Sequence, residues 1–266
     1  MDPVVIAVAS SQPPKYRKPL TLSREQQKVF EMVLAGKSVF FTGPAVRFEL
    51  VQSVRLIVQK GTGKSILLKE IIRALRDDPR RGFETLAVTA STGIAGLNIG
   101  GSTVHSFAGI GLGKESKERL GDKIKGSYKL RTRWRKTQTL IIDEISMLDG
   151  VLFDKLEYIA RFVRDPNRPF GGIQLVVSGD FFQLPPVPDQ THKQIMPATY
   201  AFDAQTWQTC IGTPIVLSRV FRQKDNVFID ILSSMRHGDL SQDHINILAK
   251  LSRPLIYADG IEPTHL

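Results

Sequence analysis

Residues 38–45 read SVFFTGPA and residues 61–65 read GTGKS, and together these two stretches decide the fold. The first is an apolar run followed by a glycine, and the second has the form that opens a helix in a phosphate-binding loop. Such a loop requires Gly, four residues, then Gly-Lys-Ser or Gly-Lys-Thr, but Val58 stands where the first Gly belongs. When residues 46–60 are left out, Gly43 takes that place and every defined position matches. We therefore interpret the two stretches as one split phosphate-binding loop; a chance GTGKS in a glycine-containing turn is the alternative.

The fifteen intervening residues, 46–60, are unsuited to a working phosphate loop. Eight of them are Val, Leu, Ile or Phe, a poor composition for a solvated loop, and they separate backbone amides that must surround one phosphate group. A Val codon begins with GT and a Lys codon can end with AG, so Val46 and Lys60 permit the usual intron borders, and the length keeps the reading frame. We expect residues 46–60 to be a retained intron. A genuine insertion that folds outward as a small apolar lobe is the alternative.

Four short apolar runs without polar alternation are typical of strands buried on both faces. They span residues 38–42, 85–89, 139–142 and 173–178. Helical patterns cover residues 24–35, 65–76 and 150–164, and the first of them follows Ser23 and Gln26, which have the spacing of a capping box. The alternation predicts an α/β fold, a doubly wound parallel sheet with helices on both faces. Ligands bind at the carboxyl ends of the strands in such folds.

Polar residues follow the third and fourth runs directly. Asp143 and Glu144 stand where an NTPase places one carboxylate for magnesium and another that polarises the attacking water. Gln183 follows the fourth run, where its amide can reach the terminal phosphate. Paired acids can also merely cap a helix. A split phosphate loop, an acidic pair and a Gln at three strand ends, in this order, nevertheless favour ATP hydrolysis.

The chain of 266 residues carries 36 Lys or Arg against 26 Asp or Glu, which gives a net charge of +10. Residues 114–136 hold ten basic and three acidic residues, so much of the excess lies there. Trp134 and Tyr128 within this basic run could stack on bases while the cations meet phosphates, which favours a nucleic-acid partner. A solvated helix face, with the two aromatic rings in an ordinary core, is the alternative.

Cysteine content and hydropathy exclude several classes of protein. Cys210 is the single cysteine, so neither an intramolecular disulfide nor a cysteine-based zinc site is possible. The longest early apolar run, residues 4–9, is too short for a membrane span and no basic region precedes it. We therefore expect no signal peptide and no membrane partner.

Long strings of the chain resemble the petite-integration-frequency (Pif-type) helicases, superfamily-one DNA motors that move 5′ to 3′ on single strands. The strings are LSREQQKVF, FFTGPA with GTGKS, VTASTGIAGLNIGGSTVHSFAGIGLG, LIIDEISML, PFGGIQLVVSGDFFQLPPV and LSRVFRQKDNVFIDILSSMRHG. The resemblance runs from about residue 20 to residue 255. It implies a RecA-like P-loop NTPase that uses ATP and Mg²⁺.

The resemblance also implies roles in ATP chemistry. Gln26 would recognise adenine, Lys64 would hold the β and γ phosphates, and Ser65 and Asp143 would serve Mg²⁺. Glu144 would be the general base, Gln183 the γ-phosphate sensor and Arg222 the arginine finger, unless Arg222 is only part of a surface ion pair. The implied ATP-binding residues are Gln26, Gly43, Gly61, Thr62, Gly63, Lys64 and Ser65.

Four further residues match segments that touch the single-stranded DNA backbone in such motors. They are Thr92, Gly93, Thr103 and His105. Thr and Gly are also ordinary turn residues, and His105 could equally be a core imidazole.

The expected organisation has three parts. Residues 1–19, with four prolines and a basic cluster, form a flexible basic arm. Residues 20–222 form the RecA-like ATPase motor domain, and residues 223–266 are the truncated start of a second RecA-like domain. Because the family continues into the rest of that second domain, we interpret the sequence as incomplete.

The leading hypothesis is an ATP-dependent 5′ to 3′ DNA helicase whose partners are single-stranded DNA and DNA with duplex junctions. From the family we expect a monomer that acts in DNA repair, recombination and telomere or genome maintenance, in the nucleus and also the mitochondrion. The alternative is a nucleic-acid-binding fragment without ATPase or unwinding activity, because its phosphate loop is interrupted and its second motor domain is missing. A P-loop kinase or an ATPase with another substrate is disfavoured, since the long DNA-motor strings would then need another explanation.

Overall fold

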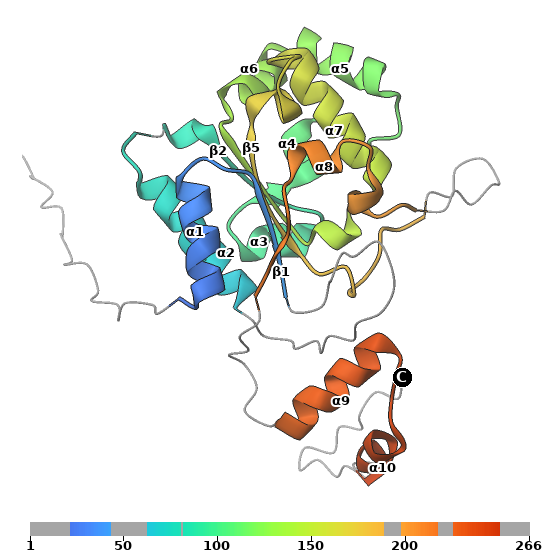
Figure 1. The fold of residues 1–266 in the computed structure, drawn as a ribbon. Coiled ribbons are helices and arrows are strands. Elements are labelled where there is room, and N and C mark those ends of the chain that lie inside the picture. The colour runs from blue at the N-terminus through green and yellow to red at the C-terminus, as the bar shows by residue number, and fades with distance from the viewer. Residues whose placement is uncertain (1–21, 44–62, 81, 189–197, 218–225, 251–266) are drawn as a thin grey trace, which may run out of the picture.

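The computed structural model describes residues 22–43, 63–80, 82–188, 198–217 and 226–250. Within them, six strands form one sheet in the order β3-β2-β4-β5-β1-β6, and every pairing is parallel. The strands are β1 (Val39–Thr42), β2 (Leu86–Ala90), β3 (Ser102–Thr103), β4 (Thr139–Asp143), β5 (Gln174–Gly179) and β6 (Ile215–Val216). Helices lie on both faces of this sheet (Figure 1). The doubly wound parallel sheet predicted from the sequence is therefore confirmed.

The helices within the same residues include the three that the sequence predicts, each to within one residue at either end. They are α1 (Arg24–Leu34), α2 (Lys64–Asp77) and α7 (Gly150–Val163). The others are α3 (Gly93–Asn98), α4 (Val104–Ala108), α5 (Lys117–Gly126), α6 (Tyr128–Lys136), α8 (Trp207–Cys210), α9 (Asn226–His237) and α10 (Gln242–Lys250). The predicted capping box is present, because the Gln26 amide N–H donates to Ser23 Oγ at 3.3 Å and the Ser23 N–H donates to Gln26 Oε1 at 2.9 Å.

Two apolar cores cover the two faces of the sheet, because side chains alternate along each strand. On β1, Val39 and Phe41 pack against the apolar residues of α1 and α2. Phe40 points to the other face, where it belongs to the core formed with α4 to α8. Its ring lies 5.6 Å from the rings of both Phe181 and Trp207 in edge-on contacts. β1 and β5 are thus buried along their whole length and β2 and β4 along most of theirs, as their apolar runs predict.

The basic run of residues 114–136 folds into α5 and α6, at the edge of the sheet where the strands begin. The Lys136 ammonium pairs with Glu84 in the 3-10 turn η1 (Phe83–Thr85), directly before β2, and the Gln138 N–H donates to the Thr85 carbonyl at 2.7 Å. Figure 1 shows both helices at the opposite end of the sheet from the point where β1 ends. The basic run is therefore remote from the carboxyl ends of the strands.

Past the sheet, α10 is linked to α9 by His244 Nε2 and Asp230 Oδ2, which lie 3.1 Å apart. No helix in the described ranges is both long and apolar enough to cross a membrane. The predicted basic arm and the residues 46–60 lie outside the described residues. Arg222, the expected arginine finger, lies outside them as well.

Candidate nucleotide site

The two ends of the split phosphate loop are well defined. β1 ends at Thr42, next to Gly43, and α2 begins at Lys64. Gly63 precedes α2 with φ +77°, a left-handed conformation that glycine adopts without the steric cost of a Cβ. No described side chain caps this helix N-terminus, and the N-terminus of a helix favours an anion. Gly61 and Thr62 lie outside the described residues.

Two polar atoms are buried where the loop begins and ends. The Lys64 Nζ has almost no exposed surface, although it belongs to a side chain that carries a charge. The Thr42 hydroxyl is equally buried and has no hydrogen-bond partner among the described residues. Burying such a hydroxyl without a partner is unfavourable. A phosphate oxygen would satisfy it, so the polar atoms present here fit the nucleotide that the sequence predicts.

The acidic pair lies at the carboxyl end of the central strand β4. Asp143 Oδ1 accepts a short hydrogen bond from the Ser178 hydroxyl on the neighbouring strand β5, and it also accepts from the Glu144 N–H at 3.0 Å. These two donors fix one oxygen of the carboxylate. Glu144 has φ +54°, an uncommon conformation for a residue other than glycine, and it turns the chain sharply after the strand.

The electrostatics of Glu144 connect the acidic pair to the phosphate loop. Burial raises the pKa of the Glu144 carboxyl above its ordinary value, the Lys64 ammonium opposes this increase, and the Asp143 carboxylate adds to it. Lys64 at the start of α2 is therefore close enough to Glu144 to act on it through space. A carboxylate whose pKa is raised by burial is a stronger base than an exposed one, as a residue that activates water requires.

Gln183 is held by a neighbouring carboxylate that sequence reasoning missed. Asp180 is only 4% exposed and lies directly after β5. Its Oδ2 accepts from Gln183 Nε2 at 3.2 Å and its carbonyl accepts from the Gln183 N–H at 2.8 Å. Neither Ser178 nor Asp180 belongs to a recognisable sequence pattern, because each acts through another polar residue.

Magnesium would find oxygen donors in this site. Ser65 is exposed at the start of α2, and Asp143 is partly exposed at the end of β4. Mg²⁺ usually takes one or two carboxylates together with substrate phosphates and water. In the described part of the chain no group of three or more His, Cys, Asp or Glu could form a separate metal site. The donor set thus fits a cation that is held jointly with the nucleotide.

Gln26, the predicted adenine-recognising residue, is 3% exposed and uses its side-chain oxygen in the capping box of α1. This contact fixes the orientation of the amide. Gln26 therefore caps the N-terminus of α1, in addition to its predicted role in adenine recognition.

Of the four predicted DNA contacts, Thr92 and Gly93 follow β2, Thr103 ends the adjacent strand β3, and His105 follows it. Thr92 Oγ1 accepts from the Ala95 N–H at 3.3 Å and Thr103 Oγ1 accepts from the Ser106 N–H at 3.1 Å, so each threonine caps a short helix. Gly93 is exposed. Burial lowers the pKa of the half-buried His105, which favours its neutral form at pH 7. The sheet thus places these residues near one another, at the carboxyl ends of two paired strands.

The prediction that Trp134 in the basic run could stack on a base is wrong. The Trp134 side chain is fully buried, its ring packs 5.4 Å from that of Phe107, and its Nε1 donates to the Ala108 carbonyl at 3.2 Å. It cannot stack on a base. Tyr128 is 76% exposed and remains available for such a contact.

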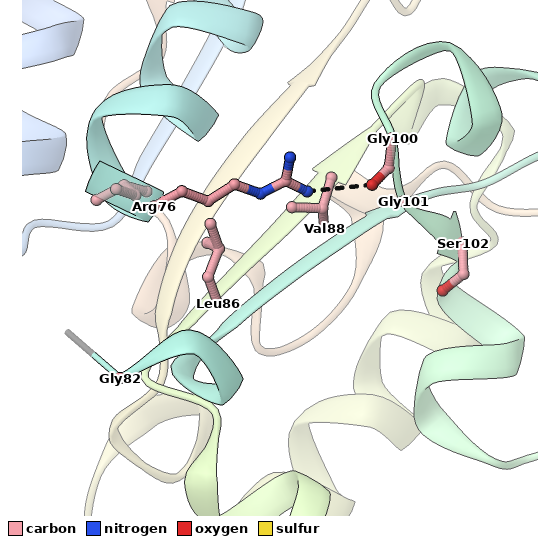
Figure 2. Close-up of a pocket in the computed structure, with 8 residues that line it drawn as sticks. Arg76, Gly82, Leu86, Val88, Gly100, Gly101 and Ser102 are labelled. Carbon is pink, nitrogen blue, oxygen red and sulfur yellow. Dashed lines mark hydrogen bonds between the residues drawn. The ribbon is translucent and has the colours of Figure 1, made fainter. Parts of the chain in front are cut away.

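A separate pocket of about 300 Å³ lies between α2 and the start of β3 (Figure 2). It is lined by Leu75, Arg76, Gly82, Leu86, Val88, Gly100, Gly101 and Ser102. Arg76 Nη2 reaches across it to donate to the Gly100 carbonyl at 3.1 Å. None of the predicted site residues that the structure describes lines this pocket, so it is separate from them.

Comparison with known proteins identifies relatives of the chain. The family of PIF1-like helicases matches residues 21–246. The ATP-dependent DNA helicase PIF1 of Emericella nidulans is 51% identical over 249 residues, which are 93% of this chain and 31% of that protein. The chain thus spans about a third of the length of this relative.

Solved structures agree with this assignment. The crystal structure of Pif1 helicase from Candida albicans has a TM-score of 0.76 and 47% identity, and the match covers 92% of this chain and 51% of that one. Pif1 helicase from Bacteroides, in complex with ADP-AlF3 and ssDNA, has a TM-score of 0.66 and 28% identity, covering 90% and 51%. The likeness confirms the RecA-like fold class predicted from the sequence.

Proposed function

Since this chain belongs to the PIF1-like helicase family, we propose that it is the ATP-hydrolysing motor part of a DNA helicase that moves 5′ to 3′. The observation that carries the proposal is the meeting of three elements at one edge of the sheet. The N-terminus of α2, the acidic pair after β4 and the Gln183 loop after β5 all lie at carboxyl ends of strands, where such folds bind nucleotides. The Bacteroides relative binds ADP-AlF3 and ssDNA.

Each side chain has a distinct part in the proposed reaction. Lys64 binds the β and γ phosphates and neutralises charge as it develops, and the α2 N–H groups add to this. Glu144 takes a proton from the attacking water, which its raised pKa favours. Gln183, oriented by Asp180, contacts the γ phosphate. Arg222 is proposed as the arginine finger.

Ser65 and Asp143 would hold Mg²⁺, which when bound neutralises phosphate charge and orients the substrate. Ser178 keeps the Asp143 carboxylate in place through its hydroxyl. Gln26 is proposed to recognise adenine.

For DNA, we propose that Thr92, Gly93, Thr103 and His105 contact the backbone of a single strand. All four lie beside the nucleotide edge, so a movement coupled to ATP could reach them. The whole protein would act on single strands and on duplex junctions, in DNA repair, recombination and telomere or genome maintenance. We assign it to the nucleus and the mitochondrion on the basis of the family.

The interrupted phosphate loop favours a second candidate, a nucleic-acid-binding protein that does not hydrolyse ATP. The test is nucleotide binding by the chain as it stands and by a variant in which Ala45 is joined to Gly61. We expect the chain to bind ATP weakly and the variant to bind it tightly. Equal, tight binding by both, or mature transcripts that consistently encode residues 46–60, would show that the segment is a genuine insertion.

The catalytic assignment is tested in a protein that has a continuous phosphate loop and the second motor domain. Lys64→Ala and Glu144→Gln should both abolish DNA-stimulated phosphate release, because one removes the cation on the phosphates and the other the base. Only Glu144→Gln should retain ATP binding. Normal turnover by either variant would contradict the assignment.

A further inference from the structure

We infer that the exposed faces of α5 and α6 form a second DNA-binding surface that takes the phosphate backbone of a duplex, an inference that rests on the proposed function. The two helices are consecutive, with only Ser127 between them. They carry most of the ten basic residues of the run, which has a net charge of +7. The surface lies at the edge of the sheet where the strands begin, away from the nucleotide site (Figure 1).

Three arginines of the run are already used inside the protein. Arg133 Nη1 donates to the carbonyls of Ser106 and Phe107 at 3.0 and 2.7 Å, at the end of α4. Arg135 Nε donates to the Val163 carbonyl at 3.2 Å, at the end of α7. Arg131 Nη1 donates to the Lys125 carbonyl at 3.0 Å. These guanidinium groups satisfy helix ends, so they are not the principal phosphate contacts.

Other cations of the run point outward. Arg119 on α5 and Lys129 on α6 are exposed, and neither side chain has a hydrogen bond or an ion pair in the described part of the chain. Lys117 and Lys125 are also exposed, with each ammonium over an aromatic ring of α7, at 5.2 and 4.5 Å from the centroid. The rings hold these two cations in place without neutralising them.

The side of α5 that carries Lys117 and Lys125 is packed against α7. The rings of Tyr158 and Phe162 are stacked with centroids 5.8 Å apart, and α5 approaches them at Gly121, where a Cβ would lie 3.1 Å from Phe162 Cδ1. Leu120 and Ile124 are fully buried beneath the helix. The position of α5 is therefore fixed, so the cations along it project from a helix with a set spacing, which favours a partner with regularly spaced charges.

A duplex suits this surface better than a single strand. Proteins that bind single strands combine cations with aromatic rings on which the bases stack. Trp134 is buried and only Tyr128 is exposed within the run, so the surface offers cations with almost no stacking platform. Duplex DNA keeps its bases inside and presents two closely spaced rows of phosphates, which cations alone can bind.

The experiment measures binding by fluorescence anisotropy over a range of salt concentrations, without nucleotide. The probes are a blunt duplex of about 20 base pairs and an oligo-dT strand of the same length. The variant is Arg119→Gln with Lys129→Gln. The matched control is Lys28→Gln with Lys69→Gln, which removes the same charge from two exposed cations on the helices α1 and α2 of the opposite face.

We expect the first variant to lower the slope of log K against log salt for the duplex by about 1.8, since each lost phosphate contact contributes about 0.9. Its binding to oligo-dT, and duplex binding by the control pair, should stay unchanged. If the variant loses as much affinity for oligo-dT as for the duplex, the surface binds single strands. If the control pair loses as much duplex affinity, the effect is one of long-range charge alone. If the variant loses no duplex affinity, the helices present only a solvated face. Each of these overturns the inference, and each is independent of nucleotide binding, which tests the proposed function.

Discussion

Replacing Ser178 by alanine should weaken magnesium-dependent nucleotide binding, although Ser178 itself is not proposed to contact the magnesium ion or the nucleotide. The Ser178 side chain is fully buried and its hydroxyl donates to Asp143 Oδ1, across the pair of strands β4 and β5. Removing a group that orients a metal ligand typically weakens metal binding by about 10- to 100-fold. Asp143 Oδ1 keeps its second donor, the Glu144 N–H at 3.0 Å, so the lower end of this range applies. We therefore expect roughly tenfold weaker binding, which is about 1.4 kcal/mol of binding free energy.

The assay is a fluorescence titration of a labelled ADP at a series of Mg²⁺ concentrations, in the protein with Ala45 joined to Gly61. The Mg²⁺ concentration at half-saturation should rise about tenfold in Ser178→Ala, in line with the effect of removing groups that orient metal ligands. Urea unfolding of the same variant should show a loss of about 1–2 kcal/mol.

Ser146→Ala is the matched control. Ser146 is also fully buried after β4, but its hydroxyl has no hydrogen-bond partner among the described residues, so its removal breaks no bond to Asp143. The control should keep the magnesium dependence of the parent. If Ser178→Ala keeps it too, or if both variants shift equally, the Ser178 hydroxyl does not orient the metal ligand and the reasoning fails.

Three further outcomes follow from the packing. Trp134→Ala should destabilise the domain by about 3–5 kcal/mol in urea unfolding, because a buried ring and its bond to Ala108 are lost; a neutral effect would contradict the core assignment. Burial raises the pKa of the Cys210 thiol to about 11, so iodoacetamide at pH 8 should label the folded chain far more slowly than the urea-unfolded chain. Gly101→Ala should lower the melting temperature, since its Cβ would lie 2.2 Å from the Val88 carbonyl oxygen; an unchanged value would contradict this packing.

The central strands could be predicted from sequence because each is a continuous apolar run with a clear physical cause. β1 and β5 are buried along their whole length and β2 and β4 along most of theirs, so the middle of each strand is apolar. The outer strands β3 and β6 have two residues each, too few for any pattern. β6 exists because Ile215 and Val216 pair with the end of β1, a contact that depends on the assembled sheet.

In the basic run, the many charged residues make the buried apolar residues of α5 and α6 hard to recognise from sequence. α5 and α6 carry so many Lys and Arg residues that a solvated face or a DNA contact was the natural interpretation. The spacing of Leu120 with Ile124, and of Leu130 with Trp134, nevertheless places apolar side chains one helical turn apart. That signal could have revealed two helices with their apolar sides turned inward. It could not have revealed that the alternate arginines reach back to the ends of α4 and α7, because those carbonyls are far away in sequence.

The turn at Glu144 explains why the details of the acidic pair required the structure. A positive φ at a residue other than glycine costs of order 1–3 kcal/mol and persists only where its surroundings impose it. Here Asp143 Oδ1 binds the Glu144 N–H, while Gly179 on β5 leaves room for the chain that follows, since a Cβ there would lie 2.8 Å from the Ile145 N. The letters Asp-Glu after a strand predict two carboxylates at one place. Only the fold distinguishes the two carboxylates, because the Ser178 hydroxyl fixes Asp143, whereas burial raises the pKa of Glu144 and the charge of Lys64 opposes that rise.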